Sequence, residues 1–178
     1  MEFLSCKENE IPELNLRAIP QLESLSCWAN HLSELDLSGN PRLVLLQCGD
    51  NQIRQLCLSH VPELESLSCD GNLLSSLDLS SVPKLIRLSC EENEIQVLDL
   101  TTVPRLEHLS CGGNRLSRLD LSALSDLKEL RCEGNLLADL HLSAMPNLRE
   151  IECGGNMIAE LDLSGLDHLD YLDCSRNH

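Results

Sequence analysis

Apolar and polar positions follow a pattern along this chain that repeats every 21 residues. The repeat reads L-x-x-L-x-C-x-x-N-x-L-x-x-L-D-L-S-x-x-P-x, and two consecutive copies occupy residues 64–84 and 85–105. Eight full copies fit in residues 1–168, and residues 169–178 begin a ninth. A fixed period of this length is typical of a solenoid, in which each repeat forms one coil. We therefore expect residues 1–178 to form a single array, with no linker and no second domain.

Each repeat contains two stretches in which apolar and polar residues alternate, as they do in a half-buried strand. In the first stretch, Leu67 and Cys69 are expected to face inward and Ser68 outward. The second stretch, residues 76–80, alternates in the same way. A coil of 21 residues leaves little room for a helix, and the proline at the twentieth repeat position opposes one there. The pattern predicts two short extended segments on opposite sides of each coil.

Nine cysteines and nine asparagines occupy fixed repeat positions, with each asparagine three residues after its cysteine. An asparagine amide can donate to an exposed carbonyl and accept from a nearby N–H, so we expect this column to pin the turns. The asparagines run from Asn9 to Asn177. The column cysteines are Cys6, Cys27, Cys48, Cys69, Cys90, Cys111, Cys132, Cys153 and Cys174.

The repeat resembles the leucine-rich repeats, and more narrowly their 21-residue bacterial subclass sometimes called IRREKO. The resemblance covers the whole chain. It implies a mostly β leucine-rich repeat solenoid, with parallel strands stacked in coils of 21 residues, a second extended segment per coil and little or no helix. It also implies that the strands line a concave face whose outward residues bind other molecules. It does not identify a partner, because repeats of this family serve many binding roles.

The acidic composition narrows the classes of function. A formal charge of −16 would repel phosphate, which argues against nucleic-acid binding and permits basic protein partners. No apolar run approaches the roughly 18 residues of a membrane helix, so we expect no membrane partner. The first ten residues lack the pattern of a signal peptide. Reduced thiols favour a cytoplasmic location, and an exported bacterial effector or surface protein is the alternative.

The cysteine column could serve several kinds of chemistry. Neighbouring Cα atoms in stacked strands lie about 4.8 Å apart, within the range of disulfides. Parallel side chains, however, keep the Cβ atoms farther apart than the roughly 3.8 Å of a disulfide. Zinc needs ligands that converge tetrahedrally, whereas a ladder offers a line. We expect a reduced ladder in the core, with disulfides, a metal site and redox sensing as the alternatives.

Cys57 lies outside this column, at the repeat position where most other repeats have aspartate. We expect it to be an exposed, inert thiol; a reactive pair with His60, or crosslinking under oxidation, is the alternative. The aspartates of that position could suggest calcium, but calcium needs about six to eight oxygens around one point, so we expect a structural or solvated role. No catalytic motif is present. We therefore expect no enzyme activity, no cofactor and no metal.

The outward strand positions carry the candidate binding residues. Phe3, Trp28 and Leu45 are expected to form an apolar spot near the N-terminal end, where tryptophan is a strong interface anchor. Acidic residues beside Tyr171 are expected to form a strip near the C-terminal end. In the structural alternative, the aromatic residues pack under a missing cap and the acids only confer solubility. The candidate residues are Phe3, Trp28, Leu45, Asp70, Arg87, His108, Glu129, Arg131, Glu133, Glu150, Glu152, Tyr171 and Asp173.

We predict a protein-interaction scaffold that binds a protein through its concave strand face, with the acidic strip favouring a basic patch on the partner. The alternative is a structural repeat segment of a larger effector or surface protein whose activity lies outside this chain. A third class is a metal or redox protein that uses the thiols. The repeats begin at residue 1 and stop within a coil at His178, so we expect either a fragment or end-to-end self-association.

Overall fold

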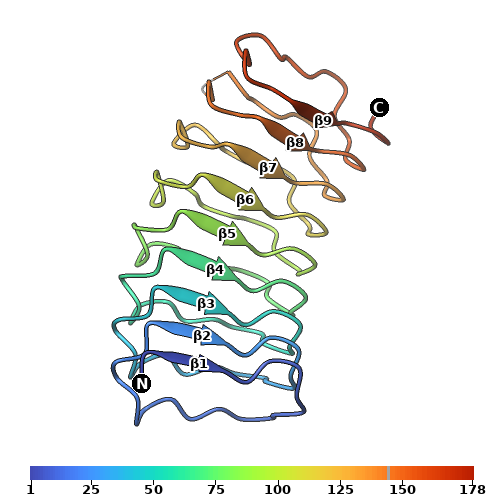
Figure 1. The fold of residues 1–178 in the computed structure, drawn as a ribbon. Helices are drawn as coiled ribbons and strands as arrows, with labels where there is room; N and C mark the ends of the chain where they lie inside the picture. The colour runs from blue at the N-terminus through green and yellow to red at the C-terminus, as the bar shows by residue number, and fades with distance from the viewer. Residues whose placement is uncertain (144) are drawn as a thin grey trace.

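The computed structural model describes residues 1–143 and 145–178 and shows one stack of coils (Figure 1). Each coil contributes a strand of three residues, and the strands form one parallel sheet in sequence order. The register advances by one repeat at each step, so that Leu67 pairs with Leu88. No helix occurs within the described ranges, as the period predicted. The strands are β1 (Phe3–Ser5), β2 (Ser24–Ser26), β3 (Leu45–Gln47), β4 (Ser66–Ser68), β5 (Arg87–Ser89), β6 (His108–Ser110), β7 (Glu129–Arg131), β8 (Glu150–Glu152) and β9 (Tyr171–Asp173).

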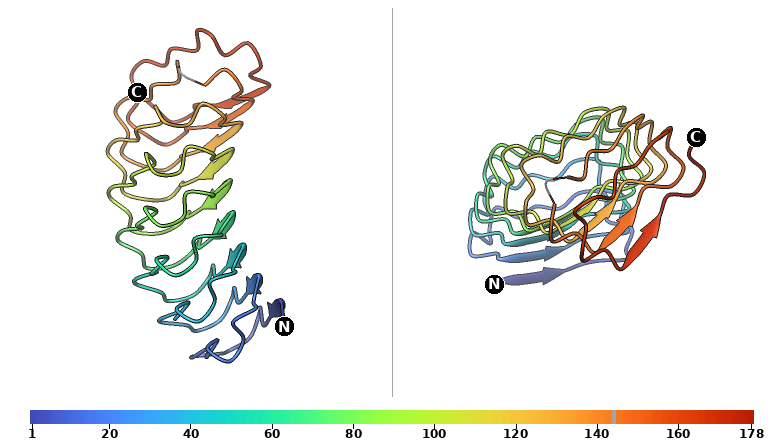
Figure 2. Two further views of the ribbon diagram at one scale, coloured as in Figure 1. Left: turned by 90° about the vertical axis from the view of Figure 1, so that its left-hand side faces the viewer. Right: turned by 90° about the horizontal axis from the view of Figure 1, so that it is seen from above.

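The strands line the inner side of a curved stack, and the returning segments of the coils lie on the outer side (Figure 2). We call these the strand side and the back side. The back segments contain the second predicted extended stretch, but none of their described residues belongs to a strand. Backbone hydrogen bonds there close turns within one coil, such as Val103 N–H to the Leu100 carbonyl at 3.2 Å. The back segments are residues 13–17, 34–38, 55–59, 76–80, 97–101, 118–122, 139–143 and 160–164.

The asparagine column joins neighbouring coils, as the sequence predicted. Asn72 Oδ1 accepts from the Ile53 N–H of the preceding coil at 2.9 Å. Its Nδ2 donates to the carbonyl of Cys48 in that coil at 3.0 Å and to the carbonyl of Cys69 in its own coil at 3.1 Å. Equivalent bonds recur at each interior asparagine of the column, for example at Asn93. The amide thus satisfies backbone groups that the turn leaves outside the sheet.

Leucine columns and the cysteine ladder form the core. Strand residues such as Leu25 and Leu109 are fully buried. The column cysteines from Cys27 to Cys153 are also buried, so the predicted cysteine ladder in the core is confirmed for its interior members, and all ten cysteines are free in the structure. The two end members differ, because Cys6 is half-buried and Cys174 is exposed. Each terminal thiol has a neighbouring coil on one side only.

The turn that follows each strand requires left-handed backbone at the eighth repeat position. Gly71 has φ of +60°, and the second glycine of each doublet, Gly113 and Gly155, has φ of +62° and +65°. Other coils adopt the same conformation with a side chain present, as at Asp50 with φ of +48° and Glu92 with φ of +50°. Glycine relieves the strain at this position, but the stack tolerates other residues there.

No described segment forms a helix long and apolar enough to span a bilayer.

Candidate interaction face

Strands β1–β9 lie together on the strand side (Figure 2), and the sequence placed most of the candidate residues at their outward positions. At its N-terminal end, Phe3 is 63% exposed. The register places Ser24 between Phe3 and Leu45, so these two apolar side chains stand on alternate strands. Trp28 follows β2 and is half-buried, with the Lys7 ammonium 5.8 Å from its ring centroid. Phe3 and Leu45 of the predicted apolar spot therefore lie at one end of the face with a serine between them, and Trp28 lies two residues beyond β2.

Serine side chains line the middle of the face, and two of them donate hydrogen bonds to the carboxylate of Asp70. Asp70 accepts from Ser68 Oγ at 2.7 Å, from Ser89 Oγ and from the Glu91 N–H at 2.8 Å. Both of its oxygens are therefore used within the chain. Arg87, on β5, is exposed and lies opposite His108 in the sheet register.

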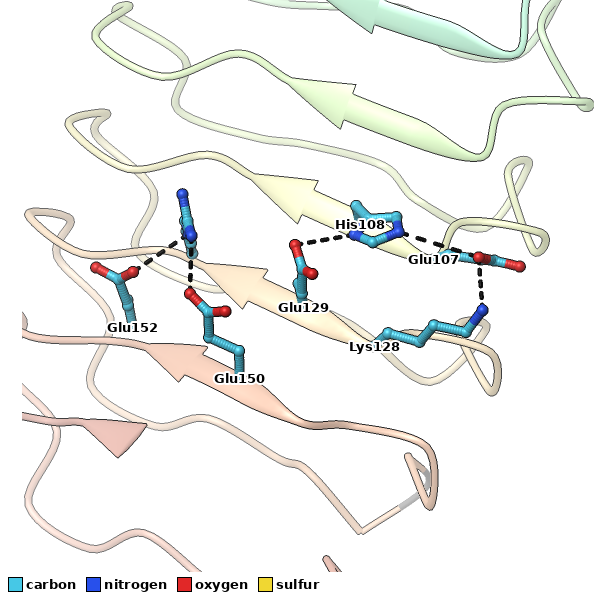
Figure 3. Close-up of polar contacts among 7 residues, drawn as sticks. Glu107, His108, Lys128, Glu129, Glu150 and Glu152 are labelled. Carbon is cyan, nitrogen blue, oxygen red and sulfur yellow. Dashed lines mark hydrogen bonds and ion pairs between the residues drawn. The ribbon is translucent and has the colours of Figure 1, made fainter. Parts of the chain in front are cut away.

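An ion-pair network crosses β6 and β7 (Figure 3). His108 Nδ1 lies 2.9 Å from Glu129 Oε2, and His108 Nε2 lies 4.0 Å from Glu107 Oε2. The Lys128 ammonium lies 2.7 Å from the same Glu107 oxygen. The hydrogen bond from Lys128 is the main cause that lowers the pKa of Glu107, so this carboxylate is charged at neutral pH. Glu129 of the predicted acidic strip is thus partnered by a histidine of the same chain.

A second network joins β7 to β8 (Figure 3). The Arg131 guanidinium lies 2.7 Å from Glu150 Oε1 through its Nη2. Its Nε lies 3.2 Å from Glu152 Oε1, although the alignment is too poor for a hydrogen bond. Burial raises the pKa of Glu152 despite the nearby guanidinium. Arg131 therefore neutralises part of the acidic strip.

Glu133 occupies a less favourable position than the other acids. Its side chain lies over Gly112, where an added Cβ would come within 2.6 Å of Glu133 Oε1. Its other oxygen, Oε2, is buried without a hydrogen-bond partner among the described residues. The pKa of nearby Glu91 is raised, first by burial and then by the charges of Glu133 and Asp70. These acids repel one another across the glycine.

The C-terminal end of the face consists of β9. Tyr171 is 52% exposed and lies opposite Glu150 in the sheet register. Asp173 Oδ1 accepts from the Ser175 N–H at 2.9 Å, and the bonds to Ser175 lower the pKa of Asp173. The acidic strip and the tyrosine are therefore neighbours, as the sequence predicted, and Asp173 also caps a turn.

The sequence interpretation did not include Glu107 and Lys128, which complete the first network. Their signal was present in the period, because residues 21 apart stand side by side in the stack. Opposite charges at this separation also pair at Glu63–Lys84 and Glu94–Arg115. A search for opposite charges one period apart would have found these pairs before the structure did.

No described group of three or more histidine, cysteine or acidic side chains could hold a metal ion. Aspartates of the back side instead cap their own turns; Asp78 Oδ1 accepts from the Ser80 N–H at 2.9 Å. Cys57 is exposed, and its Sγ lies 3.2 Å from Ser59 Oγ, which in turn lies 3.0 Å from His60 Nδ1. The hydrogen bonds with Ser59 lower the pKa of the Cys57 thiol. The serine therefore stands between the predicted thiol and histidine.

Comparisons with known proteins agree with this architecture. The family model described as leucine-rich repeats in two copies matches residues 104–144. The functional domain of InlJ from Listeria monocytogenes, which includes a cysteine ladder, is 32% identical with a TM-score of 0.97. YopM from Yersinia enterocolitica is 32% identical with a TM-score of 0.80. A leucine-rich repeat protein of Leptospira interrogans shares the fold, with 23% identity and a TM-score of 0.94.

Each match covers nearly all of this chain but less than half of the solved chain. The alignment with InlJ covers 99% of this chain and 40% of InlJ, that with YopM covers 94% and 35%, and that with the Leptospira protein covers 99% and 49%. This chain therefore spans less than half the length of these solved chains. No curated protein sequence matches it. The IRREKO subclass remains a prediction, whereas the coil geometry and the matches place the chain among the leucine-rich repeat proteins.

Proposed function

We propose that this chain is a non-enzymatic protein-interaction scaffold that binds a protein partner through its strand side. The observation that carries the proposal is the contrast between neighbouring columns of the sheet. The inward column is leucine in every strand except β8, where it is Ile151. The adjacent outward column changes from Phe3 through serine, arginine and histidine to Tyr171. Folding requires the inward residues, whereas the fold leaves most outward residues free to serve recognition.

The charge of this face favours a partner with a basic patch. Lys128 and Arg131 pair with some carboxylates near the C-terminal end, but neither Glu133 nor Asp173 forms an ion pair with a basic side chain among the described residues. The bonds to Ser175 are the main cause that lowers the pKa of Asp173, and Arg176 lies near enough to lower it further. A lysine or arginine from outside could supply the missing charge, which favours specificity and rapid association. The exposed Phe3 and the half-buried Trp28 would add apolar contacts at the other end.

The test is affinity capture from a lysate of the source cell, with the immobilised chain and matched variants. Phe3→Ser and Trp28→Ala each remove an apolar contact from the strand side. The double variant Glu150→Lys/Glu152→Lys reverses its acidic charge. The control, Glu34→Lys/Glu160→Lys, makes the same change of charge at exposed positions of the back side. Far-UV circular dichroism and the melting temperature establish that each variant is folded.

Captured protein should fall with the strand-side variants and persist with the back-side control. Equal capture by wild type and all folded strand-side variants would refute binding through this face. The partner, its basic patch and the location of the protein in the cell would follow from identifying what is captured. A cytoplasmic partner would support the location that the thiols favour.

A second candidate function is a structural repeat segment of a larger effector or surface protein. The observation that favours it is that this chain spans 40% of InlJ and 35% of YopM. In that case, the chain would hold another region in place and its strand-side variants would capture what the wild type captures. Introducing the same strand-side variants into the longer protein, and measuring its activity and its capture of partners, would separate the two functions.

A further inference from the structure

Hollows recur on the back side of the stack, away from the proposed binding face. One, near the N-terminal end, is lined by Glu13, Leu14 and Asp36; another is lined by Leu56, Cys57 and Asp78. The one with the largest apolar floor measures about 610 Å³ and spans three coils through back segments 97–101, 118–122 and 139–143. We call it the back groove. The strand side contributes no residue to these hollows.

The floor of the back groove consists of leucine side chains from two neighbouring coils. No backbone bond between described residues joins segment 97–101 to segment 118–122. The leucines at the fourteenth repeat position therefore remain partly accessible, with Leu98 at 5% and Leu119 at 8% exposure, whereas Leu109 on the strand side has 0%. At the rim, Val97 is 60% exposed. An apolar side chain entering here would contact leucine and valine together.

The rim of the back groove is acidic. Asp99 Oδ1 accepts from the Thr101 N–H at 3.0 Å and from Thr101 Oγ1 at 2.6 Å. Asp120 Oδ1 accepts from the Ser122 N–H at 3.0 Å. The bonds with Thr101 and Ser122 lower the pKa of these two carboxyl groups, so both are charged at neutral pH. In each case the bonds use Oδ1 and leave Oδ2 available to a ligand.

Other charged groups of the rim do not cancel this charge. Asp139 adds a third carboxylate, and Arg118 and His141 also line the groove. Arg118 lies close enough to lower the pKa of Asp120, but it forms no ion pair among the described residues. A second copy of this chain is a poor occupant, because each copy carries a formal charge of −16. Charge complementarity favours a cationic occupant.

We propose that the back groove binds a short extended segment of a basic protein, with an apolar side chain on Leu98 and Leu119 and lysine or arginine on Asp99 and Asp120. An extended segment presents alternate side chains to opposite sides, which suits a groove with an apolar floor and charged rims. This site is separate from the strand side, so the two proposals stand or fall independently.

The probe is a fluorescein-labelled peptide of alternating lysine and leucine, five residues long and flanked by glycines, titrated with the protein in about 0.15 M salt to screen long-range attraction. Asp99→Asn/Asp120→Asn removes two rim charges while the amide oxygen can still cap each turn. Glu23→Gln/Glu65→Gln is the matched control, because both glutamates are exposed and lie outside the groove. Val97→Lys places a cation on the rim. Fluorescence anisotropy gives each Kd.

The rim variant should weaken binding about fivefold, since each exposed ion pair contributes modestly. Val97→Lys should weaken it about tenfold by repulsion and loss of the apolar contact. The control should change Kd by less than about twofold. Replacing the leucines of the peptide by serine should weaken binding to wild type. Equal losses of affinity in the rim and control variants would mean that the peptide binds by general charge attraction. Equal affinity for the leucine and serine peptides would mean that the groove binds only the cations. Either result overturns the proposal.

Discussion

The strand side and the back side of each coil bury the same kind of residue, yet they differ in how the coils are joined. On the strand side, backbone hydrogen bonds connect every neighbouring pair from β1 to β9. On the back side, no backbone hydrogen bond joins one described segment to the next. Most of the aspartates there bond within their own turns, and Asp36 also accepts from the Arg17 guanidinium of the preceding coil. Leucines of the strand side are consequently sealed, whereas Leu56 and Leu119 of the back side remain at 7% and 8% exposure.

This difference teaches that one hydrogen-bonded edge is enough to fix the register of a solenoid. The opposite edge has no backbone bonds between its described segments, and it lies on the outer side of the curved stack (Figure 2). It also separates two kinds of surface. On the strand side, side chains form ion pairs across coils, and on the back side there are hollows, of which the back groove has an acidic rim.

The largest expected effect concerns the bonds between coils. Asn93→Ala removes the acceptor of the Leu74 N–H and the donor to the carbonyls of Cys69 and Cys90. Each buried group left unpaired costs about 1–3 kcal/mol, so we expect a loss of roughly 3 kcal/mol or more in the free energy of unfolding. Asp99→Ala, which removes an exposed bond of the back side, should lose much less. Chemical denaturation measures both, and comparable losses would break the distinction between the two sides.

The second prediction compares the change in stability when one thiol from each side is replaced by serine. Cys90→Ser places a hydroxyl in the sealed ladder, where burial without a partner costs about 1–3 kcal/mol. Cys57→Ser changes an exposed position and should leave stability unchanged. Thermal unfolding under reducing conditions tests this pair.

Reaction with Ellman's reagent in the folded state offers a second readout for the same pair. Burial raises the pKa of Cys27 to about 12, whereas the Ser59 hydrogen bonds lower that of Cys57. Cys57 should therefore react first, the terminal Cys174 and Cys6 later, and the buried thiols only on unfolding. Fast reaction of the Cys57→Ser variant at several sites would show that the ladder is open.

A smaller effect is expected where the back side returns to the strand side. Asn40 is fully buried in a column that holds Val61 and Val82 in the following coils, and its Oδ1 has no partner. Its Nδ2 donates to the carbonyls of Leu16 and Ile19, which also accept backbone N–H groups. Asn40→Val should therefore stabilise the protein by about 1 kcal/mol. Loss of stability in denaturant would show that the amide bonds outweigh the unpaired oxygen.

The smallest effect concerns charge on the strand side. The pKa of Glu91 is raised in the folded protein, so its charged form is disfavoured and its contribution to stability falls as pH rises through the unfolded value toward the folded one. Glu91→Gln should slightly raise the melting temperature at pH 8 and make little difference at pH 4. Melting curves at both pH values check the sign. A larger gain at pH 4 than at pH 8 would contradict the repulsion among Glu91, Glu133 and Asp70.

The interior of this protein could be predicted from sequence because its contacts recur at one fixed separation. The positions of Leu67, Cys69 and Asn72 in the repeat were sufficient to assign the strand, the ladder and the pinned turn, and the structure confirms each. The candidate face was predicted as a list of outward residues. The ion pairs on this face could not be predicted from the repeat positions alone, because Arg131 reaches Glu150 and Glu152 only in particular side-chain conformations.

The sequence by itself determined the period, the parallel register and the set of inward residues, because a 21-residue repeat brings the same position of each coil into contact with its neighbours. Only the tertiary structure decided which acids are neutralised, which oxygens stay unpaired and where the back side opens. Those outcomes depend on side-chain rotamers and on the curvature of the stack, and neither is encoded in the spacing of a repeat.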